Sequence, residues 1–524
     1  FDRTADLLEL AWPVMNGSFL SAKWLSWIKV LPEQLIRIRP VLCAAFGAAL
    51  LDTGEFQSVK EHLDDAQKWL SCKNPESDMI VVDKKQFQIL GANIARSRAY
   101  LAQISGDLDS SIKYAQQVMK LSSENDYQIR AEASALLGAG FWKVGNLNDA
   151  YRCLTDGMLG MKKAGNILFS IAIAGFIAEI LLERGQLKKA FEIYTKTIQS
   201  SSDMEDDKLW ITANLYLGLS KLHLERGDLE TAEQNLQICK KLNEYAVLGD
   251  GPYHYALAQA KIYDSRGDID SALNELIKAE DLYFINLAPE VYPLTALKLS
   301  LWIRQGNLLK ARSWIEKQDL STSDELNYLN TFEHITLARL LMAEYQIGND
   351  ESLVPELKEF LQRLHTIAEK NKWNGFLLEI LILQAITYKL HNDITPALEV
   401  IMHALTLAEP EGYIRIFIDE GPVMEKLLSL VSIEGKIKIY KNKIIRSFGE
   451  KSALPANQPL PESLTQRELE VLDLVAQGLS NNEIGERLFL ALSTVKGHNR
   501  IIYDKLDVQR RTEAVARARE LGLI

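Results

Sequence analysis

The stretch Gly145–Leu154, GNLNDAYRCL, decides the fold of this chain, because its pattern returns four times at nearly constant spacing. In each copy, glycine precedes a polar and then an apolar residue, and alanine stands five positions after the glycine. The further copies are Gly185–Ala190, Gly227–Ala232, Gly267–Ala272 and Gly306–Ala311. Together with a looser copy at Gly106, the glycines are 39, 40, 42, 40 and 39 residues apart. A period this regular indicates stacked supersecondary units.

The chemistry of each copy predicts an antiparallel pair of helices. Glycine can end the first helix in the left-handed conformation, and the Asp or Asn beside it can cap the next helix. The alanine lets the two helices approach closely. Neighbouring hairpins would then bury one another's faces in a superhelix that resembles tetratricopeptide repeats, whose usual unit is about 34 residues. We therefore predict an all-α array over residues 1–432, which serves as a sensor or interaction domain.

Composition limits the classes of function. The chain has 524 residues and a net charge of −11, and its 47% hydrophobic and 25% charged residues are typical of a soluble protein with several domains. No P-loop and no catalytic constellation is found, and the eight histidines show no metal-ligand spacing. We predict that this chain is not an enzyme and that it holds no cofactor or metal. The four cysteines form no C-x-x-C pair and are expected to be free thiols: Cys43, Cys72, Cys153 and Cys239.

Nothing in the sequence predicts membrane insertion. The most apolar run, Ile167–Leu182, is too short to cross a bilayer and contains Glu179. No signal peptide opens the chain. We expect a cytoplasmic protein, and its first residue, Phe1, suggests a fragment of something longer.

The last stretch, Ser463–Ile524, has a different pattern of four short helices. The first helix runs from a capping box at Thr465 and Glu468 to Gly478, and a second box at Ser480 and Glu483 starts the next helix. The third and fourth helices are expected at 493–506 and 512–522. Two short capped helices a few residues apart, the later one carrying Lys and Arg, are the layout of a DNA-reading helix-turn-helix.

Several motifs in this stretch resemble the LuxR-type helix-turn-helix family. They are L-T-x-R-E-x-E-V-L, G-x-S-N-x-E-I, T-V-K-x-H, K-L and R-T-E-A-V, which together cover most of residues 463–524. Further upstream, Trp24–Trp27 and Ala408–Gly421 resemble the start and the end of the helical-repeat region in MalT-like regulators. The chain therefore resembles MalT-like members of the large LuxR-type regulators over essentially its whole length.

This resemblance implies a function and a set of partners. It implies a transcription regulator, expected to be an activator, whose repeat arm senses an inducer or a regulatory protein. The expected partners are double-stranded promoter DNA and RNA polymerase, with an oligomer forming on DNA. The family's ATP-binding domain has no counterpart in this sequence, so either it precedes these residues or the protein lacks it, and ATP would be bound only through such an upstream domain. The alternative hypothesis is a protein-interaction scaffold in which the array carries the main function.

The resemblance also assigns DNA contacts on the third helix of the motif. Lys496 and Arg500 are four residues apart and share one helix face, and with the backbone of Gly497 they would approach base edges. The residues expected to contact phosphates are Thr494, Asn482, Lys505, Arg510 and Arg511. The opposite seam comprises Val495, Asn499, Ile502 and Leu506. Asn499 stands where the family is normally apolar, so either it finds a buried partner or the helix is rotated slightly, which would also move Arg500.

Three local features complete the prediction. Residues 433–462 form a basic, proline-bearing linker to the DNA-binding domain at 463–524. We expect its basic residues to belong to a solvated charged helix, and non-specific attraction to DNA is the alternative. Within Tyr413–Ile418 we expect a short helix in which Arg415 pairs with Asp419. The apolar stripe of the fourth helix either closes the core of its own domain or pairs two domains on DNA.

Overall fold

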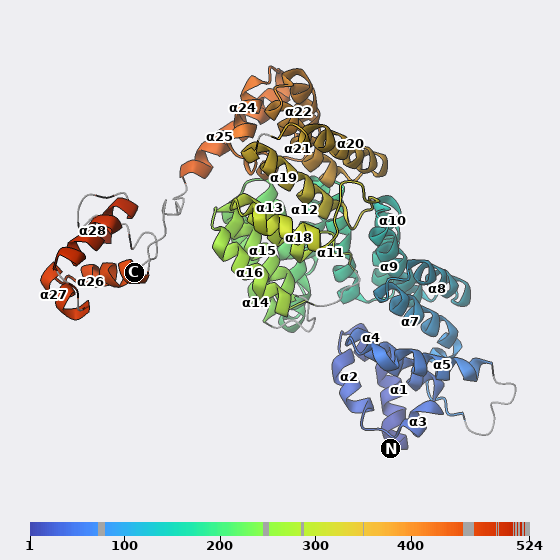
Figure 1. Ribbon diagram of the computed structural model, residues 1–524. Helices are drawn as coiled ribbons and strands as arrows, with labels where there is room; N and C mark the ends of the chain where they lie inside the picture. Colours follow the sequence, from blue (N-terminus) through green and yellow to red (C-terminus); the bar gives the residue numbers. More distant parts are fainter. Residues whose placement is uncertain are drawn as a thin grey trace. The chain divides into compact units, whose positions relative to one another are not determined.

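The structure is a computed structural model whose described parts are almost entirely helical (Figure 1). It describes residues 1–71, 79–244, 251–283, 288–348, 350–453, 466–488, 490, 492–506, 508, 511, 514–515 and 518. The chain divides into two compact units. The larger unit comprises Phe1–Ser265 and Ile269–Phe448 and is called the array here, and the smaller one includes Gly449–Ile524 and is called the C-terminal unit.

The helices follow one another along the chain with short connections. The first group is α1 (Asp2–Gly17), α2 (Ser21–Ile28), α3 (Glu33–Arg37), α4 (Pro40–Asp52), η1 (Phe56–Ser58), α5 (Val59–Leu70), α6 (Lys84–Gln88), α7 (Leu90–Ile104), α8 (Leu108–Leu121), α9 (Tyr127–Lys143) and α10 (Leu147–Lys163). The second group is α11 (Ile167–Glu183), α12 (Leu187–Ser200), η2 (Asp206–Thr212), α13 (Ala213–Glu225), α14 (Leu229–Asn243), α15 (Gly251–Ser265), α16 (Ile269–Asp281), α17 (Leu294–Arg304) and α18 (Leu308–Lys317). The last group is α19 (Thr331–Gly348), α20 (Leu353–Asn371), α21 (Asn374–Leu390), α22 (Ile394–Ala408), α23 (Arg415–Ile418), α24 (Pro422–Leu430), α25 (Gly435–Ala453), α26 (Gln466–Ala476), α27 (Asn481–Leu488) and α28 (Leu492–Leu506).

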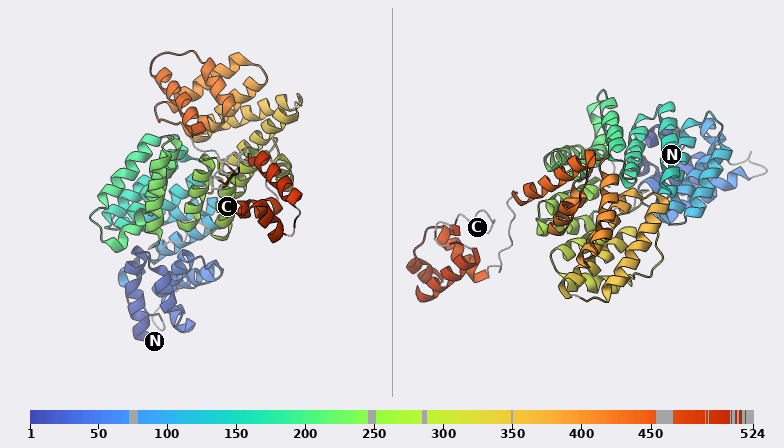
Figure 2. Two further views of the ribbon diagram at one scale, coloured as in Figure 1. Left: turned by 90° about the vertical axis from the view of Figure 1, so that its left-hand side faces the viewer. Right: turned by 90° about the horizontal axis from the view of Figure 1, so that it is seen from above.

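The repeat pattern forms the helix hairpins that were predicted from it. All six glycines at positions 106, 145, 185, 227, 267 and 306 have positive φ, between 69° and 82°, and each lies just after a helix. Beside three of them, Asp107, Asn146 and Asp228 cap the following helices through their side-chain oxygens. From α7 to α18 successive helices stack as hairpins in chain order (Figures 1 and 2). The tetratricopeptide-like all-α fold is confirmed.

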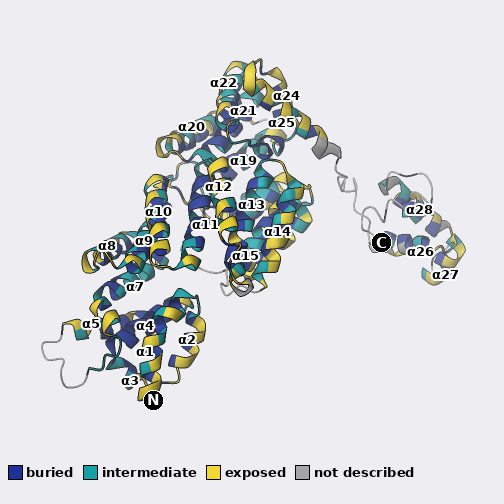
Figure 3. Ribbon diagram, turned by 180° about the vertical axis from the view of Figure 1, so that it is seen from behind, coloured by how far each residue is buried: buried dark blue, intermediate teal, exposed yellow. Residues whose placement is uncertain are grey.

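The alanine of each repeat is buried inside the array. The five alanines are fully buried: Ala150, Ala190, Ala232, Ala272 and Ala311. A larger side chain there would force the two helices apart. The inner helix of a hairpin is buried nearly all round, as Figure 3 shows for α11, whereas the outer helix keeps one exposed face. This burial explains why Ile167–Glu183 reads as an apolar run.

The array also folds back on itself. The indole N–H of Trp373, just before α21, donates a 2.7 Å hydrogen bond to the carbonyl of Gly145, 228 residues earlier. A Cβ added to Gly145 would lie 2.6 Å from Cζ2 of Trp373, and one added to Gly227 would lie 3.1 Å from Cγ2 of Ile414. The backbone N–H of Ile414 donates to the carbonyl of Glu225 at 2.8 Å. We call this set of contacts between early turns and late helices the return contact.

The segment after the last hairpin follows the prediction in one part and departs from it in another. Arg415–Ile418 is a short helix, and Arg415 pairs with Asp419 at 2.5 Å, as expected. The expected linker from residue 433, by contrast, begins as helix α25, and Tyr440, Ile444 and Phe448 of this helix are buried in the array core. This apolar stripe was not recognised in the sequence, because lysines separate its members. The proline-bearing part of the linker lies outside the described residues.

The C-terminal unit contains three described helices around a small core. Val471 and Leu472 of α26, Ile484 of α27, and Val495 and Ile502 of α28 form its centre. The predicted fourth helix lies for the most part outside the described residues. The described members of its apolar stripe belong to the same core: Ala514 and Ala518 are buried there and Val515 packs against it.

Candidate nucleic-acid interface and ligand cavity

The second helix of the motif starts at the predicted capping box. The backbone N–H of Ser480 donates to the Glu483 carboxylate at 2.7 Å, and the N–H of Glu483 donates to the Ser480 hydroxyl at 3.4 Å. Hydrogen bonds that the carboxylate accepts from the hydroxyl and the backbone N–H of Ser480 lower the pKa of Glu483. The box therefore fixes the residue at which α27 begins, and with it the position of the turn that leads to α28.

The inward face of α28 is the predicted seam. Val495 and Ile502 are fully buried, and Asn499 is 6% exposed. The side-chain amide of Asn499 donates a 2.8 Å hydrogen bond to Oδ1 of Asn481, the first residue of α27. The polar seam residue thus has a partner on the neighbouring helix, and this bond links α28 to the start of α27. The side chain of Leu506 lies outside the described residues.

The outward face of α28 carries the three residues predicted to approach base edges. Lys496, Gly497 and Arg500 are all exposed. Neither cation makes an ion pair with any residue that the structure describes. A Cβ on Gly497 would meet no atom within 4 Å, so the domain's own packing does not require glycine there. A bare backbone at this position lets another surface approach α28 closely.

The residues predicted to contact phosphates fall into two groups. Asn482 and Thr494 are exposed at the starts of α27 and α28. Lys505, however, pairs with Glu468 at 2.9 Å, with side chains only 13% and 7% exposed. Arg511 donates to the carbonyls of Val475 and Leu479, at the end of α26. Lys505 and Arg511 therefore make stabilising contacts to α26 and the residues just after it. Arg510 lies outside the described residues.

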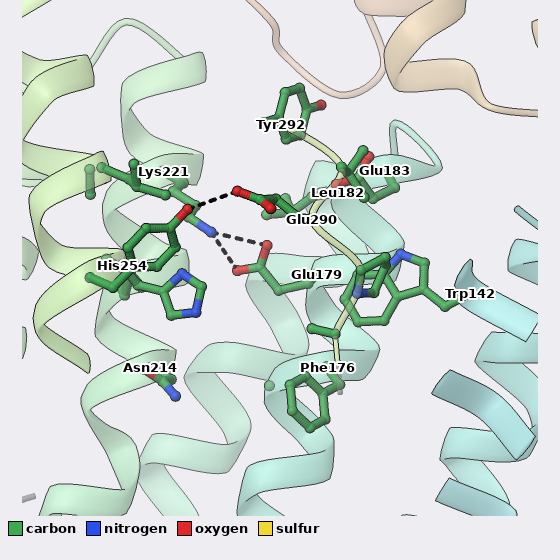
Figure 4. Close-up of a pocket in the computed structure, with 18 of the residues that line it drawn as sticks. Trp142, Phe176, Glu179, Leu182, Glu183, Asn214, Lys221, His254, Glu290 and Tyr292 are labelled. Carbon is green, nitrogen blue, oxygen red and sulfur yellow. Dashed lines mark hydrogen bonds and ion pairs between the residues drawn. The ribbon is translucent and has the colours of Figure 1, made fainter. Parts of the chain in front are cut away.

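The array holds a second candidate site, a large, partly open cavity of about 1490 Å³. It is lined by helices from both ends of the array, including α9, α11, α13, α15 and α21. Figure 4 shows Trp142, Phe176 and Tyr292 around this space together with several charged side chains. Its volume exceeds the roughly 300–1,000 Å³ of common small-molecule pockets.

Ion pairs cross the cavity wall between neighbouring hairpins. The ammonium of Lys221 on α13 lies 3.1 Å from the Glu179 carboxylate on α11, as Figure 4 shows. Arg339 on α19 contacts Glu420, which follows α23, at 2.5 Å. Such pairs join helices of the cavity wall and place charge next to apolar rings.

Glu183, at the end of α11, has no cationic partner of this kind among the described residues. The pKa of its carboxyl is raised to about 8, first because burial penalises the charged form and then because the Glu179 carboxylate repels it. Lys221 acts in the opposite direction, and the Glu379 carboxylate adds to the rise. A cation bound in the cavity would therefore stabilise the charged form of the Glu183 carboxyl.

This raised pKa predicts how stability depends on pH. Because the folded pKa of Glu183 lies above the unfolded value of about 4.5, the fold binds the extra proton between these values, and the free energy of unfolding falls as pH rises from 5 to 8. We expect Glu183→Gln to flatten this decline. Urea unfolding of both proteins at pH 5, 6, 7 and 8 measures it, and Glu399→Gln on exposed α22 is the matched control. Parallel pH curves for wild type and Glu183→Gln would contradict the assignment.

The sequence did not reveal which residues line the cavity. Trp142 and Trp210 are both buried, and both also line the cavity. Carboxylates at helical spacing look like solvated surface in the sequence, so Glu179 and Glu183 gave no signal. The return contact joins a turn glycine to a helix far away in the sequence, and no local sequence pattern predicts a pairing over that distance.

The described residues offer neither a metal site nor a membrane-spanning helix. No group of three or more His, Cys, Asp or Glu side chains there could hold a metal ion. Within the same residues, no helix has the length and apolar character that a membrane crossing requires.

Comparison with known proteins links both units to regulators. Residues 92–434 match the family described as the MalT-like TPR region, and residues 462–518 match the family described as bacterial regulatory proteins, luxR family. The chain is 23% identical to the HTH-type transcriptional regulator MalT of Serratia proteamaculans (strain 568), over 98% of this chain and 58% of that protein. It is 24% identical to the protein of the same name from Yersinia pestis (strain Pestoides F), with the same coverage.

One solved structure that matches part of this chain is a signal transduction ATPase with numerous domains and a tetratricopeptide repeat sensor, from Pyrococcus horikoshii. Its TM-score is 0.37 and its sequence identity 14%, over 83% of this chain and 64% of that chain. The chain spans little more than half the length of the MalT proteins it matches.

Proposed function

Because this chain belongs to the MalT-like TPR-region family and ends in a LuxR-type domain, we propose that it is a DNA-binding transcription regulator. The array over residues 1–432 senses an inducer or a regulatory protein. Residues 463–524 read the major groove. The regulator acts as an activator that contacts RNA polymerase and assembles on promoter DNA.

The exposed face of α28 carries this proposal. It presents two cations, Lys496 and Arg500, on either side of a glycine, and no described residue neutralises them. The remainder of α28 is anchored through Val495, Asn499 and Ile502, so this face is rigid and outward. A rigid helix with a basic outer face and a capped neighbour is what reading of base edges requires.

Asn482 and Thr494 support the same orientation. Both are exposed at helix starts, where backbone N–H groups and short polar side chains favour phosphate. Lys505 and Arg511 would have to leave their partners within the domain to reach a phosphate, so we assign them a lesser role. The sensing role of the array is supported by its cavity, which is lined by polar and aromatic groups.

The test removes each base-reading cation. With Lys496→Ala or Arg500→Ala, we expect the preference for a promoter fragment over random duplex to fall by about 1–3 kcal/mol, because a bidentate pair to guanine is lost. Fluorescence anisotropy at a fixed salt concentration measures both affinities. Lys426→Ala on exposed α24 removes the same charge far from this helix in the sequence and is expected to leave the preference intact. An unchanged preference in both α28 variants would refute the base-reading role.

A further inference from the structure

The C-terminal unit has little positive charge to spare for phosphate contact. Residues 463–524 carry nine Lys or Arg and nine Asp or Glu, so their net charge is zero. Lys505 and Arg511 have partners within the unit, and Arg467 pairs with Glu470 at 2.6 Å. A large share of the affinity of a protein for duplex DNA comes from Lys and Arg that neutralise phosphates. A further basic surface close to this unit would therefore add to its affinity for DNA.

Helix α25 carries such a surface, directly before the C-terminal unit in the sequence. Gly435–Ala453 contains six Lys or Arg and one Glu, which gives this helix a net charge of +5 in a chain whose overall net charge is −11. Four of its cations are exposed: Lys436, Lys438, Lys443 and Arg446. None of these four makes an ion pair with a residue that the structure describes. Their charge is therefore available to another molecule.

The packing of α25 on the array holds this basic surface outward. Tyr440, Ile444 and Phe448, spaced four residues apart, are buried in the array core. The hydroxyl of Tyr440 also donates a hydrogen bond to the carbonyl of Tyr413. One face of the helix is thus fixed against the array, and the opposite face is presented to solvent.

Three of the exposed cations form a row along the helix. Lys436, Lys443 and Arg446 are seven and three residues apart, which places them on one side of the helix over about 15 Å. A row of cations on a fixed helix suits the repeating phosphates of a nucleic-acid strand. A membrane surface fits less well, because an interfacial helix inserts its apolar face into the lipid and that face of α25 is already buried in the array. Ile439, which is 74% exposed, is a single aliphatic side chain in the basic row.

The sequence places α25 close to the DNA-binding helices. Twelve residues, 454–465, separate the end of α25 from the start of α26. A chain of this length spans at most about 45 Å, which is the length of about 13 base pairs. DNA held by the C-terminal unit is therefore within reach of α25. Because the two surfaces belong to one chain, even a weak contact by α25 adds to the overall affinity.

We propose that the exposed basic face of α25 binds the phosphate backbone of duplex DNA beside the stretch that residues 463–524 read. Lys436, Lys443 and Arg446 pair with phosphates and read no base. The inference rests on the proposed function, because it adds a sequence-independent contact to the same DNA complex. It assigns part of the affinity to the last helix of the array and leaves sequence preference to α28.

The experiment measures how salt weakens DNA binding by the whole chain. The probe is a duplex of 40 base pairs of random sequence, and fluorescence anisotropy gives its affinity between 50 and 300 mM salt. In the double variant Lys436→Ala/Lys443→Ala, the slope of log K against log salt is expected to become shallower by about 1.8, because two phosphate contacts are lost. At 50 mM salt the affinity is expected to fall about tenfold or more.

A matched control removes the same charge elsewhere. Lys113 and Lys120 are exposed on α8, are also seven residues apart, and make no ion pair with any residue in the described parts of the chain. Lys113→Ala/Lys120→Ala is expected to leave the slope unchanged, and Lys436→Arg/Lys443→Arg is expected to keep the wild-type slope. Urea unfolding checks that the α25 variants fold like wild type. Arg446→Gln, a single change on the same face, is expected to reduce the slope by about 0.9.

Two results would overturn the inference. One is an unchanged slope in the α25 variants, and the other is an equal change in the α8 variant, which would show an effect of net charge alone. Promoter preference, measured separately, is expected to survive in the α25 double variant and to fall in Lys496→Ala. An unchanged α25 slope with a preference that depends on Lys496 overturns this inference only. A reduced α25 slope with no role for Lys496 or Arg500 supports it and refutes base reading, and a wild-type chain that binds no duplex DNA refutes both.

Discussion

Gly145→Ala is expected to lower the free energy of unfolding of the array by about 3 kcal/mol or more. Two effects add at this position. With φ at +76°, a side chain is strained by about 1–2 kcal/mol. A Cβ would also come within 2.6 Å of Cζ2 of Trp373 and 2.7 Å of Cβ of Tyr328, and both side chains are buried. Neither ring can move aside without opening the return contact.

Gly306→Ala is the matched control for this substitution. Gly306 has the same φ of +76°, but a Cβ there would meet nothing within 4 Å. Gly306→Ala should therefore lower the free energy of unfolding only by the cost of the left-handed backbone conformation, about 1–2 kcal/mol. Urea unfolding followed by tryptophan fluorescence compares the two variants with wild type. Equal losses in both would show that the return contact contributes nothing to stability.

Lys505→Ala is expected to destabilise the C-terminal unit by about 3–5 kcal/mol, because it removes the ammonium that pairs with the buried Glu468 carboxylate. In a small domain such a loss approaches the whole free energy of folding. Hydrogen exchange of the whole chain, resolved to peptides from α26, α27 and α28, is expected to show faster exchange in all three helices.

Lys496→Ala on the same helix serves as the control. Lys496 is exposed and unpaired among the described residues, so its removal should leave exchange of α26 to α28 unchanged. The pair of variants also separates two roles of Lys505. If Lys505→Ala weakens DNA binding while exchange stays slow, Lys505 acts by contacting phosphate rather than by holding α28 to α26.

The features that the sequence predicted are local ones. Each turn glycine acts within its own hairpin, so the regular spacing of Gly145, Gly185 and Gly227 was enough to predict the array. The capping box at Ser480 and Glu483 is local in the same way. Its partner contacts lie within four residues, and the structure forms both of them.

The features that the sequence did not predict depend on residues far apart. Asn499 stood out as a polar residue in an apolar seam, but only the fold shows that Asn481 is its partner. Lys505 resembled a phosphate contact because its carboxylate partner is 37 residues away. Helix α25 looked like a charged linker, since its buried side chains, Tyr440, Ile444 and Phe448, are separated by lysines. The cavity itself arises from helices at both ends of the array.

The return contact changes how such an array should fold. Repeat arrays usually fold as a series of neighbours, so an end can fray while the middle persists. Here the hydrogen bond from Trp373 to Gly145 spans 228 residues, and this closure couples an early hairpin to a late one. During synthesis, the turns of the early hairpins stay uncovered until Trp373 and Ile414 have been added to the chain. Only then does the array close, so the cavity is completed late and the array should unfold in a single cooperative step.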